Sequence, residues 1–178
     1  MTLQSGDVII VRTGGGWLAR VAARLIRLAA ALRDQDDLIN HVAVVHHTDA
    51  AGTLWAIEAR PGGVGWVDVA RYQNQYLLST ARQPKTDAQR QQVCAAAAGM
   101  LGIGYDWHAI GMDAAEMIGL NRLWQDHTWG DDPPAHVVCS ALASWVYHRA
   151  GLDTPATPWR TTTPADWAEY VLAARWSQ

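Results

Sequence analysis

The stretch from His41 to Val69 reads HVAVVHHTDAAGTLWAIEARPGGVGWVDV, and it decides the fold class. Runs rich in β-branched and apolar residues are separated in it by the turn-forming segments DAAG and PGG. With one further run downstream, the expected strands are His41 to His47, Thr53 to Ala59, Val64 to Val69 and Tyr76 to Ala81. Because short turns join consecutive strands in antiparallel order, this region predicts an antiparallel β-meander.

The sequence on either side of the meander predicts one more strand and several helices. The apolar run from Val8 to Val11 predicts a strand, and the segments after the meander change to helical periodicity. The expected helices are Trp17 to Arg33, Thr86 to Leu101, Trp107 to Leu120, Cys139 to Ala150 and a last one capped by Thr163 and Pro164 that runs to about Ala174, with a loop from Asn121 to Pro134. Helices that follow a sheet in this way predict the α+β class.

Length and composition limit the classes of protein that the chain can be. Its 178 residues, of which 49% are hydrophobic, fit one domain spanning residues 1–178. A net charge of −3 gives no general attraction to nucleic acid, so we expect no nucleic-acid partner. No apolar run reaches the ~20 residues of a membrane span, and the start MTLQSGDVII lacks a secretory leader. We therefore expect a cytoplasmic protein, or one delivered by a virion or a secretion system.

The two cysteines differ in their surroundings. Cys139 stands at the start of an expected helix, where unpaired backbone N–H groups and the helix dipole favour a thiolate over a thiol. A buried packing role is the alternative for Cys139, and it is the expected role of Cys94 in the segment CAAAAG. A cysteine nucleophile needs an imidazole and a third group that orients it. His41 opens one strand and Glu58 ends the next, so a hairpin would place them side by side.

Several segments resemble a family of cysteine peptidases. CSALASWVYHRAG, from Cys139 to Gly151, resembles the nucleophile helix of the NlpC-type cell-wall peptidases, and the segment from His41 to Ala59 resembles their catalytic-histidine strand and the strand after it. Because the cysteine here follows the histidine, the chain is similar to the circularly permuted branch of the papain-like fold, which contains YiiX-like proteins and, more distantly, lecithin retinol acyltransferases. GDVIIVR at Gly6 to Arg12 and GIGYD at Gly102 to Asp106 resemble two further segments of that branch.

The resemblance implies a circularly permuted papain-like fold, with a β-meander or barrel packed against helices and the nucleophile at a helix N-terminus. Cys139 is then the nucleophile, His41 the general base and later acid, and Glu58 the group that orients His41. Tyr105 would place a hydroxyl near the oxyanion, and the backbone N–H of Cys139 would bind the same oxyanion.

The resemblance also implies the reaction, which is hydrolysis of an amide bond in a peptidoglycan stem peptide or a similar peptide, through a thioester and with no metal or cofactor. Acyl transfer or deacylation on a lipid is the first alternative, because the permuted branch contains lipid acyltransferases. A stripe formed by Arg20, Arg24 and Arg27 would then face a lipid or anionic surface. A non-catalytic ligand-binding module is the second alternative. Val138 and Ala141 depart from the family, which has Asp and Gly at these places.

Other motifs support different chemistry less well. GGGWLA, from Gly14 to Ala19, matches a dinucleotide-binding pattern, but Trp17 places a bulky ring where a pyrophosphate would approach. A zinc site in one loop is another candidate, although its spacing lacks the usual partner pair; its ligands would be His127, His136 and Cys139 with Asp131 or Asp132. His46 and His47 are neighbours in a strand, so we expect their side chains on opposite faces.

Overall fold

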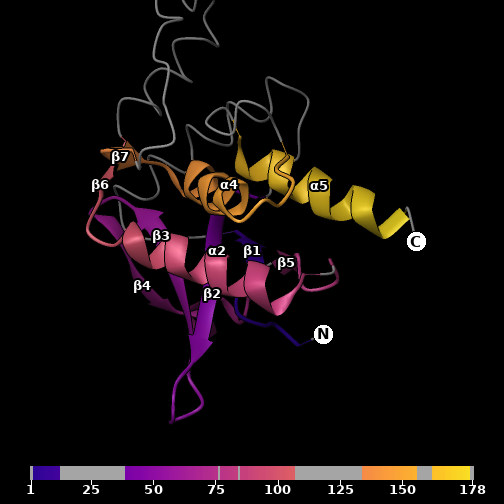
Figure 1. Cartoon of the computed structure of the whole chain (residues 1–178), viewed down its shortest axis with the longest axis horizontal. Helices are drawn as coiled ribbons and strands as arrows, with labels where there is room; N and C mark the ends of the chain where they lie inside the picture. The colour runs from indigo at the N-terminus through magenta and orange to yellow at the C-terminus, as the bar shows by residue number, and fades with distance from the viewer. Residues whose placement is uncertain are drawn as a thin grey trace, which may run out of the picture.

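The computed structural model describes residues 2–12, 39–75, 77–83, 85–106, 134–155 and 162–176. Its elements in chain order are β1 (Val8–Val11), β2 (His41–Thr48), β3 (Leu54–Arg60), β4 (Gly63–Asp68), the 3₁₀ helix η1 (Val69–Tyr72), β5 (Leu77–Ser79), α2 (Asp87–Gly99), β6 (Gly104–Tyr105), β7 (His136–Val137), α4 (Cys139–Arg149) and α5 (Pro164–Trp176) (Figure 1). The α+β class is confirmed. The helices expected at Trp17 to Arg33 and Trp107 to Leu120, and nearly all of the loop after the second, lie outside the described residues. None of the described helices is long and apolar enough to cross a membrane.

One antiparallel sheet of five strands, in the order β4-β3-β2-β1-β5, forms the centre of the described structure. The meander is confirmed for β2, β3 and β4, but it is wrong for β5, which pairs with β1 at the edge opposite β4. The reason is that β1 pairs with β2 on one side only, from Val8 opposite Val44 to Val11 opposite His41, and its other side accepts β5. Within the described residues, this sheet ends at β4 and β5 and does not close into a barrel.

Helices α2 and α4 pack against each other and against β2, so they cover one face of the sheet (Figure 1). Side chains alternate along β2, which sends Val42 and Val44 into the helix-side core and Ala43 and Val45 into a smaller core on the other face. Complete burial of such a valine contributes about 1.5–3 kcal/mol to folding. The sheet is therefore apolar on both faces near its centre.

The described helices begin and end at capping residues that can be recognised in the sequence. The Thr86 hydroxyl accepts the backbone N–H of Gln89 at 3.2 Å, and the Gln89 side chain accepts the N–H of Thr86 at 3.0 Å, which is a capping box at the start of α2. Thr163 and Asp166 make the same reciprocal pair at the start of α5. Gly151, just past α4, has φ 65°, the left-handed conformation that commonly ends a helix.

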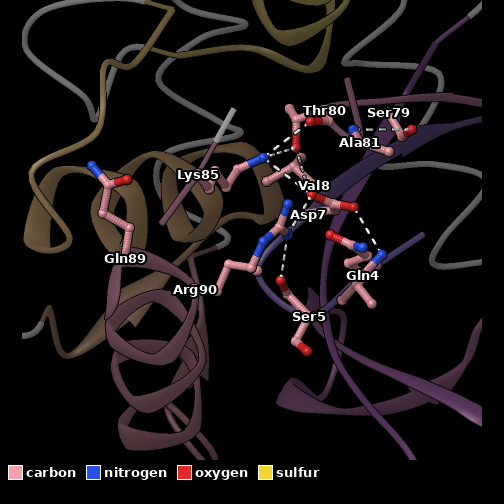
Figure 2. Close-up of polar contacts among 12 residues, drawn as sticks. Gln4, Ser5, Asp7, Val8, Ser79, Thr80, Ala81, Lys85, Gln89 and Arg90 are labelled. Carbon is pink, nitrogen blue, oxygen red and sulfur yellow. Dashed lines mark hydrogen bonds and ion pairs between the residues drawn. The ribbon is translucent and has the colours of Figure 1, made fainter. Parts of the chain in front are cut away.

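A buried ionic network joins the N-terminal segment to α2 and α4. Asp7 is fully buried, and its Oδ1 accepts hydrogen bonds from Lys85 Nζ at 3.1 Å and from Arg90 Nη1 at 3.0 Å (Figure 2). Burial lowers the pKa of Lys85, although the charge of Asp7 acts in the opposite direction. The Tyr147 hydroxyl of α4 donates to the backbone carbonyl of Gly6 at 3.0 Å. These contacts hold the start of β1 against two helices that follow much later in the chain.

The pairing of β2 with β3 contains an irregularity that the sequence does not reveal. Val45 lies opposite Ala56, but His47 lies opposite Trp55, so the register shifts between Val45 and His47. Such a bulge inserts one extra residue and turns the local side chains. As a result, His46 Nδ1 and His47 Nδ1 lie 3.0 Å apart on one side of the strand, and the expectation that these side chains point to opposite faces is wrong.

Candidate active site

The sheet brings His41 and Glu58 together on one face. Val44 lies opposite Ile57 and Val45 opposite Ala56, and the same register places Glu58 opposite Ala43. His41 is therefore a diagonal neighbour of Glu58 across two adjacent strands. His41 Nε2 lies 2.5 Å from Glu58 Oε2, and both residues are buried. The side-by-side placement predicted for these two residues is confirmed.

Cys139 is the first residue of α4 and is 2% exposed. The preceding residue, Val138, offers no side-chain hydrogen bond to the first turn, so backbone N–H groups there are not capped by a side chain. The indole N–H of Trp167 donates to the Ser140 carbonyl at 3.2 Å, which ties this end of α4 to α5. The thiol therefore lies at a fixed helix N-terminus, where the helix dipole favours negative charge.

The two ring nitrogens of His41 have different partners. Nε2 contacts Glu58, and the ring also makes a side-chain hydrogen bond with Cys139. Since Nε2 is engaged, Nδ1 is the nitrogen left to face the sulfur. A cysteine, an imidazole and a carboxylate thus form a continuous series, which can move a proton from sulfur to nitrogen while the carboxylate holds the ring.

The electrostatics of this series favour a charged imidazole. Burial lowers the pKa of His41, but the charge and hydrogen bond of Cys139, together with those of Glu58, outweigh burial and raise the pKa to about 10. Burial also raises the pKa of Glu58, but the contacts with His41, Tyr72 and Arg60 lower the pKa below its ordinary value overall. The site therefore stabilises an imidazolium between two groups that can carry negative charge.

Two residues that sequence reasoning missed complete the surroundings of Glu58. The Tyr72 hydroxyl, buried in η1, donates to Glu58 Oε2, the same oxygen that contacts His41. Arg60 Nη1 donates to Glu58 Oε1 at 3.1 Å, and the Arg60 side chain is 43% exposed. Arg60 could have been found, because residues two apart on a strand share a face. Tyr72 had no such signal, since it reaches Glu58 from a turn after β4.

Tyr105, the fourth predicted site residue, lies on β6 directly opposite Val137, two residues before Cys139. The segment before it is attached to β4, where Val64 N–H donates to the Ile103 carbonyl at 2.8 Å. Gly63 permits this approach, because a Cβ there would lie 2.7 Å from the Ile103 oxygen. Tyr105 is buried, and both burial and the charge of Cys139 raise the pKa of its hydroxyl. The structure therefore brings Tyr105 into the electrostatic range of the thiol.

Several competing motifs fall where the structure gives no description. Among the residues of the expected zinc site, only His136 and Cys139 are described, and in the described ranges no three His, Cys, Asp or Glu side chains form a group that could hold a metal. The segment from Gly14 to Ala19 and the stripe of Arg20, Arg24 and Arg27 lie outside the described residues.

Comparisons with known proteins do not assign this chain to a family. No protein-family model matches the chain, and a search of curated proteins finds no match.

Proposed function

We propose that this chain is a cysteine hydrolase with a circularly permuted papain-like fold, and that it cleaves an amide bond. The observation that carries the proposal is the buried series from Cys139 through His41 to Glu58, with the thiol at a helix N-terminus. The strand-borne His41 and Glu58 precede the helix-borne Cys139 in the chain, which is the order expected for the permuted branch. Tyr105 comes before the cysteine, as in the segment of that branch that GIGYD resembles.

The proposed reaction uses each of these groups at a defined step. His41 takes the proton of Cys139, and the thiolate attacks the substrate carbonyl carbon, whose π electrons move to the oxygen. The backbone N–H of Cys139 and the Tyr105 hydroxyl stabilise this oxyanion. His41 then gives its proton to the amide nitrogen, the C–N bond breaks, and an acyl thioester remains on Cys139. A water molecule that loses a proton to His41 attacks the thioester, and the C–S bond breaks to release the acid and the free cysteine.

The carboxylate of Glu58 keeps the His41 ring in the orientation that both proton transfers require. Its two oxygens have three partners between them, so the carboxylate has little freedom to rotate. The peptide of a peptidoglycan stem, or a similar peptide, is the substrate class that we propose, on the resemblance of the motifs to cell-wall peptidases. Lipid acyl transfer uses the same thioester chemistry, so the substrate test must distinguish it from peptide hydrolysis.

The first test measures the nucleophile by itself. The rate of iodoacetamide labelling at Cys139 and Cys94 is followed by peptide mass spectrometry from pH 5.5 to 8.5, in the wild type and in His41→Ala. A thiol that is paired with an imidazolium is labelled at a nearly constant rate across this range, whereas an ordinary thiol loses about tenfold per pH unit below about 8.5. We expect a nearly constant labelling rate for Cys139 in the wild type. In His41→Ala, we expect the labelling rate of Cys139 to fall with pH as it does for an ordinary thiol. A steep pH dependence of Cys139 in the wild type would contradict the proposal.

The second test identifies the substrate. A defined muropeptide and a fatty-acyl ester are incubated with the wild type, with Cys139→Ala and with the matched control Cys94→Ala. We expect cleavage of the muropeptide that is lost in Cys139→Ala and retained in Cys94→Ala. Transfer or release of the fatty-acyl chain without muropeptide cleavage would replace the peptidase with an acyltransferase. If neither substrate reacts although Cys139 is labelled rapidly, the peptidoglycan assignment fails and the nucleophile stands.

A further inference from the structure

A second group of ring nitrogens lies on β2, away from the candidate active site. His46 Nδ1 and His47 Nδ1 are 3.0 Å apart because the bulge at this point brings neighbouring side chains to one side of the strand. Five or six residues separate them from His41, which corresponds to about 17–20 Å along a strand. The pair is therefore distinct from the Cys139, His41 and Glu58 series.

The two rings are held by their surroundings. The Trp66 ring stands nearly perpendicular to both, at centroid distances of 4.9 Å from His46 and 5.4 Å from His47. His46 is half-buried and hydrogen-bonds to the backbone of Cys94 on α2. A neutral imidazole can offer a lone pair to a metal, and the exposed His47 leaves the pair accessible from solvent.

The separation of the two nitrogens fits one class of metal. Two nitrogens bound at the usual 2.0–2.1 Å and separated by 3.0 Å subtend an angle of about 95° at the metal. A tetrahedral site would need a separation of about 3.3–3.4 Å at the same bond length. An angle near 90° instead fits the square-planar and octahedral geometries that Ni²⁺ and Cu²⁺ adopt with nitrogen ligands. The two nitrogens now share a hydrogen bond, so binding a metal requires that one ring move its proton from Nδ1 to Nε2 and that both rings turn until their lone pairs meet at the metal. This change of tautomer releases no proton.

We propose that His46 and His47 form a two-imidazole binding site for Ni²⁺ or Cu²⁺, with water in the remaining coordination positions. No third His, Cys, Asp or Glu joins them in a metal-binding group within the described part of the chain, so the site is a two-residue chelate. Its affinity comes from the second imidazole, which is presented at a high effective concentration once the first has bound. The inference does not depend on the proposed hydrolase activity.

The test uses Ni²⁺ as the probe, because thiols reduce Cu²⁺. Isothermal titration calorimetry at pH 7.5 measures Ni²⁺ binding to the untagged full chain, to His46→Gln, to His47→Ala and to the control His148→Ala, which removes an exposed histidine from the end of α4. We expect one Ni²⁺ per chain in the wild type and in His148→Ala. Each variant of the pair should bind about 100-fold more weakly, because it loses the chelate.

The fold of each variant is checked by near-ultraviolet circular dichroism, so that loss of the site is not confused with unfolding. His47 is exposed, and its replacement by alanine leaves the packing of β2 intact. Equal Ni²⁺ affinity in the wild type and in both pair variants would overturn the proposal. So would the absence of stoichiometric binding to the wild type. Failure of Cys139 to act as a nucleophile would leave the metal result unchanged, and the reverse also holds.

Discussion

Replacement of Tyr72 by phenylalanine removes one hydroxyl from the candidate active site and leaves the ring. That hydroxyl is buried and donates to Glu58 Oε2, so Tyr72→Phe takes one of three hydrogen-bond partners from a buried carboxylate. A hydrogen bond to a charged group contributes about 1.5–3 kcal/mol. Because this hydrogen bond stabilises the charged form, the pKa of Glu58 should rise when it is lost in the variant.

The sign of the pH dependence follows from the depressed pKa of Glu58. Burial opposes the carboxylate, but His41, Tyr72 and Arg60 together hold the pKa of Glu58 below its ordinary value of 4.5. A group of this kind stabilises the fold above its unfolded pKa, and the contribution is lost as the pH falls through its folded pKa. In Tyr72→Phe the folded pKa lies higher, so the loss begins at a higher pH than in the wild type.

Urea denaturation followed by circular dichroism, from pH 8 down to the lowest pH at which both proteins fold, measures this difference. We expect Tyr72→Phe to lower the free energy of unfolding by about 1.5–3 kcal/mol at pH 7, and by progressively less as Glu58 is protonated. Tyr170→Phe is the matched control, because the Tyr170 hydroxyl donates to a backbone carbonyl, that of Asp153, at 3.3 Å. A loss in Tyr72→Phe that is the same at every pH, or that stays below about 0.5 kcal/mol, would refute the reasoning.

Three further predictions concern two contacts outside the candidate active site and one within it. Gly63→Ala should destabilise the chain by about 2–4 kcal/mol in thermal or urea denaturation, because φ is 103° and the new Cβ would lie 2.7 Å from the Ile103 oxygen. Gly52→Ala has φ 85° with open space around it and should cost only about 1 kcal/mol, so equal losses would show that the close approach does not matter. Lys85→Met should cost roughly 3 kcal/mol in urea denaturation because it removes a buried partner of Asp7, and a neutral result would show that Arg90 and the Gln4 N–H together satisfy this carboxylate. Glu58→Gln should narrow the pH range of rapid iodoacetamide labelling at Cys139 from the acid side, because an imidazolium without its carboxylate partner stabilises the neighbouring thiolate less; an unchanged range would argue against a role for Glu58 in orienting His41.

The strands and helix ends could be predicted because their signals are local. Turn residues separate β2, β3 and β4, and Thr86 and Thr163 each stand one residue before a described helix. The place of β5 could not be predicted in this way. After β1 has paired with β2, both β4 and β1 have a free edge that could accept β5, and no periodicity within the strands tells which of the two it joins.

In the candidate site, too, local signals predict some residues and miss others. His41 and Glu58 belong to consecutive strands, so a hairpin register was enough to place them together. Tyr72 enters from η1 and could be found only from the three-dimensional path of the chain after β4. The bulge between Val45 and His47 was also hidden, because HVAVVHHT has the composition of an ordinary strand.

The interior position of β1 has consequences for the order in which the chain can fold during synthesis. β1 is made before the other described strands, but it lies between β2 and β5, and the hydrogen bond from Tyr147 to Gly6 joins residues 141 positions apart. Contacts of such long range form late, because the intervening chain must first be closed into a loop. A nascent chain that ends before β5 leaves one edge of β1 unpaired, and one that ends before α4 leaves the helix-side core uncovered. The strand order therefore leaves these surfaces exposed until the later elements have been made.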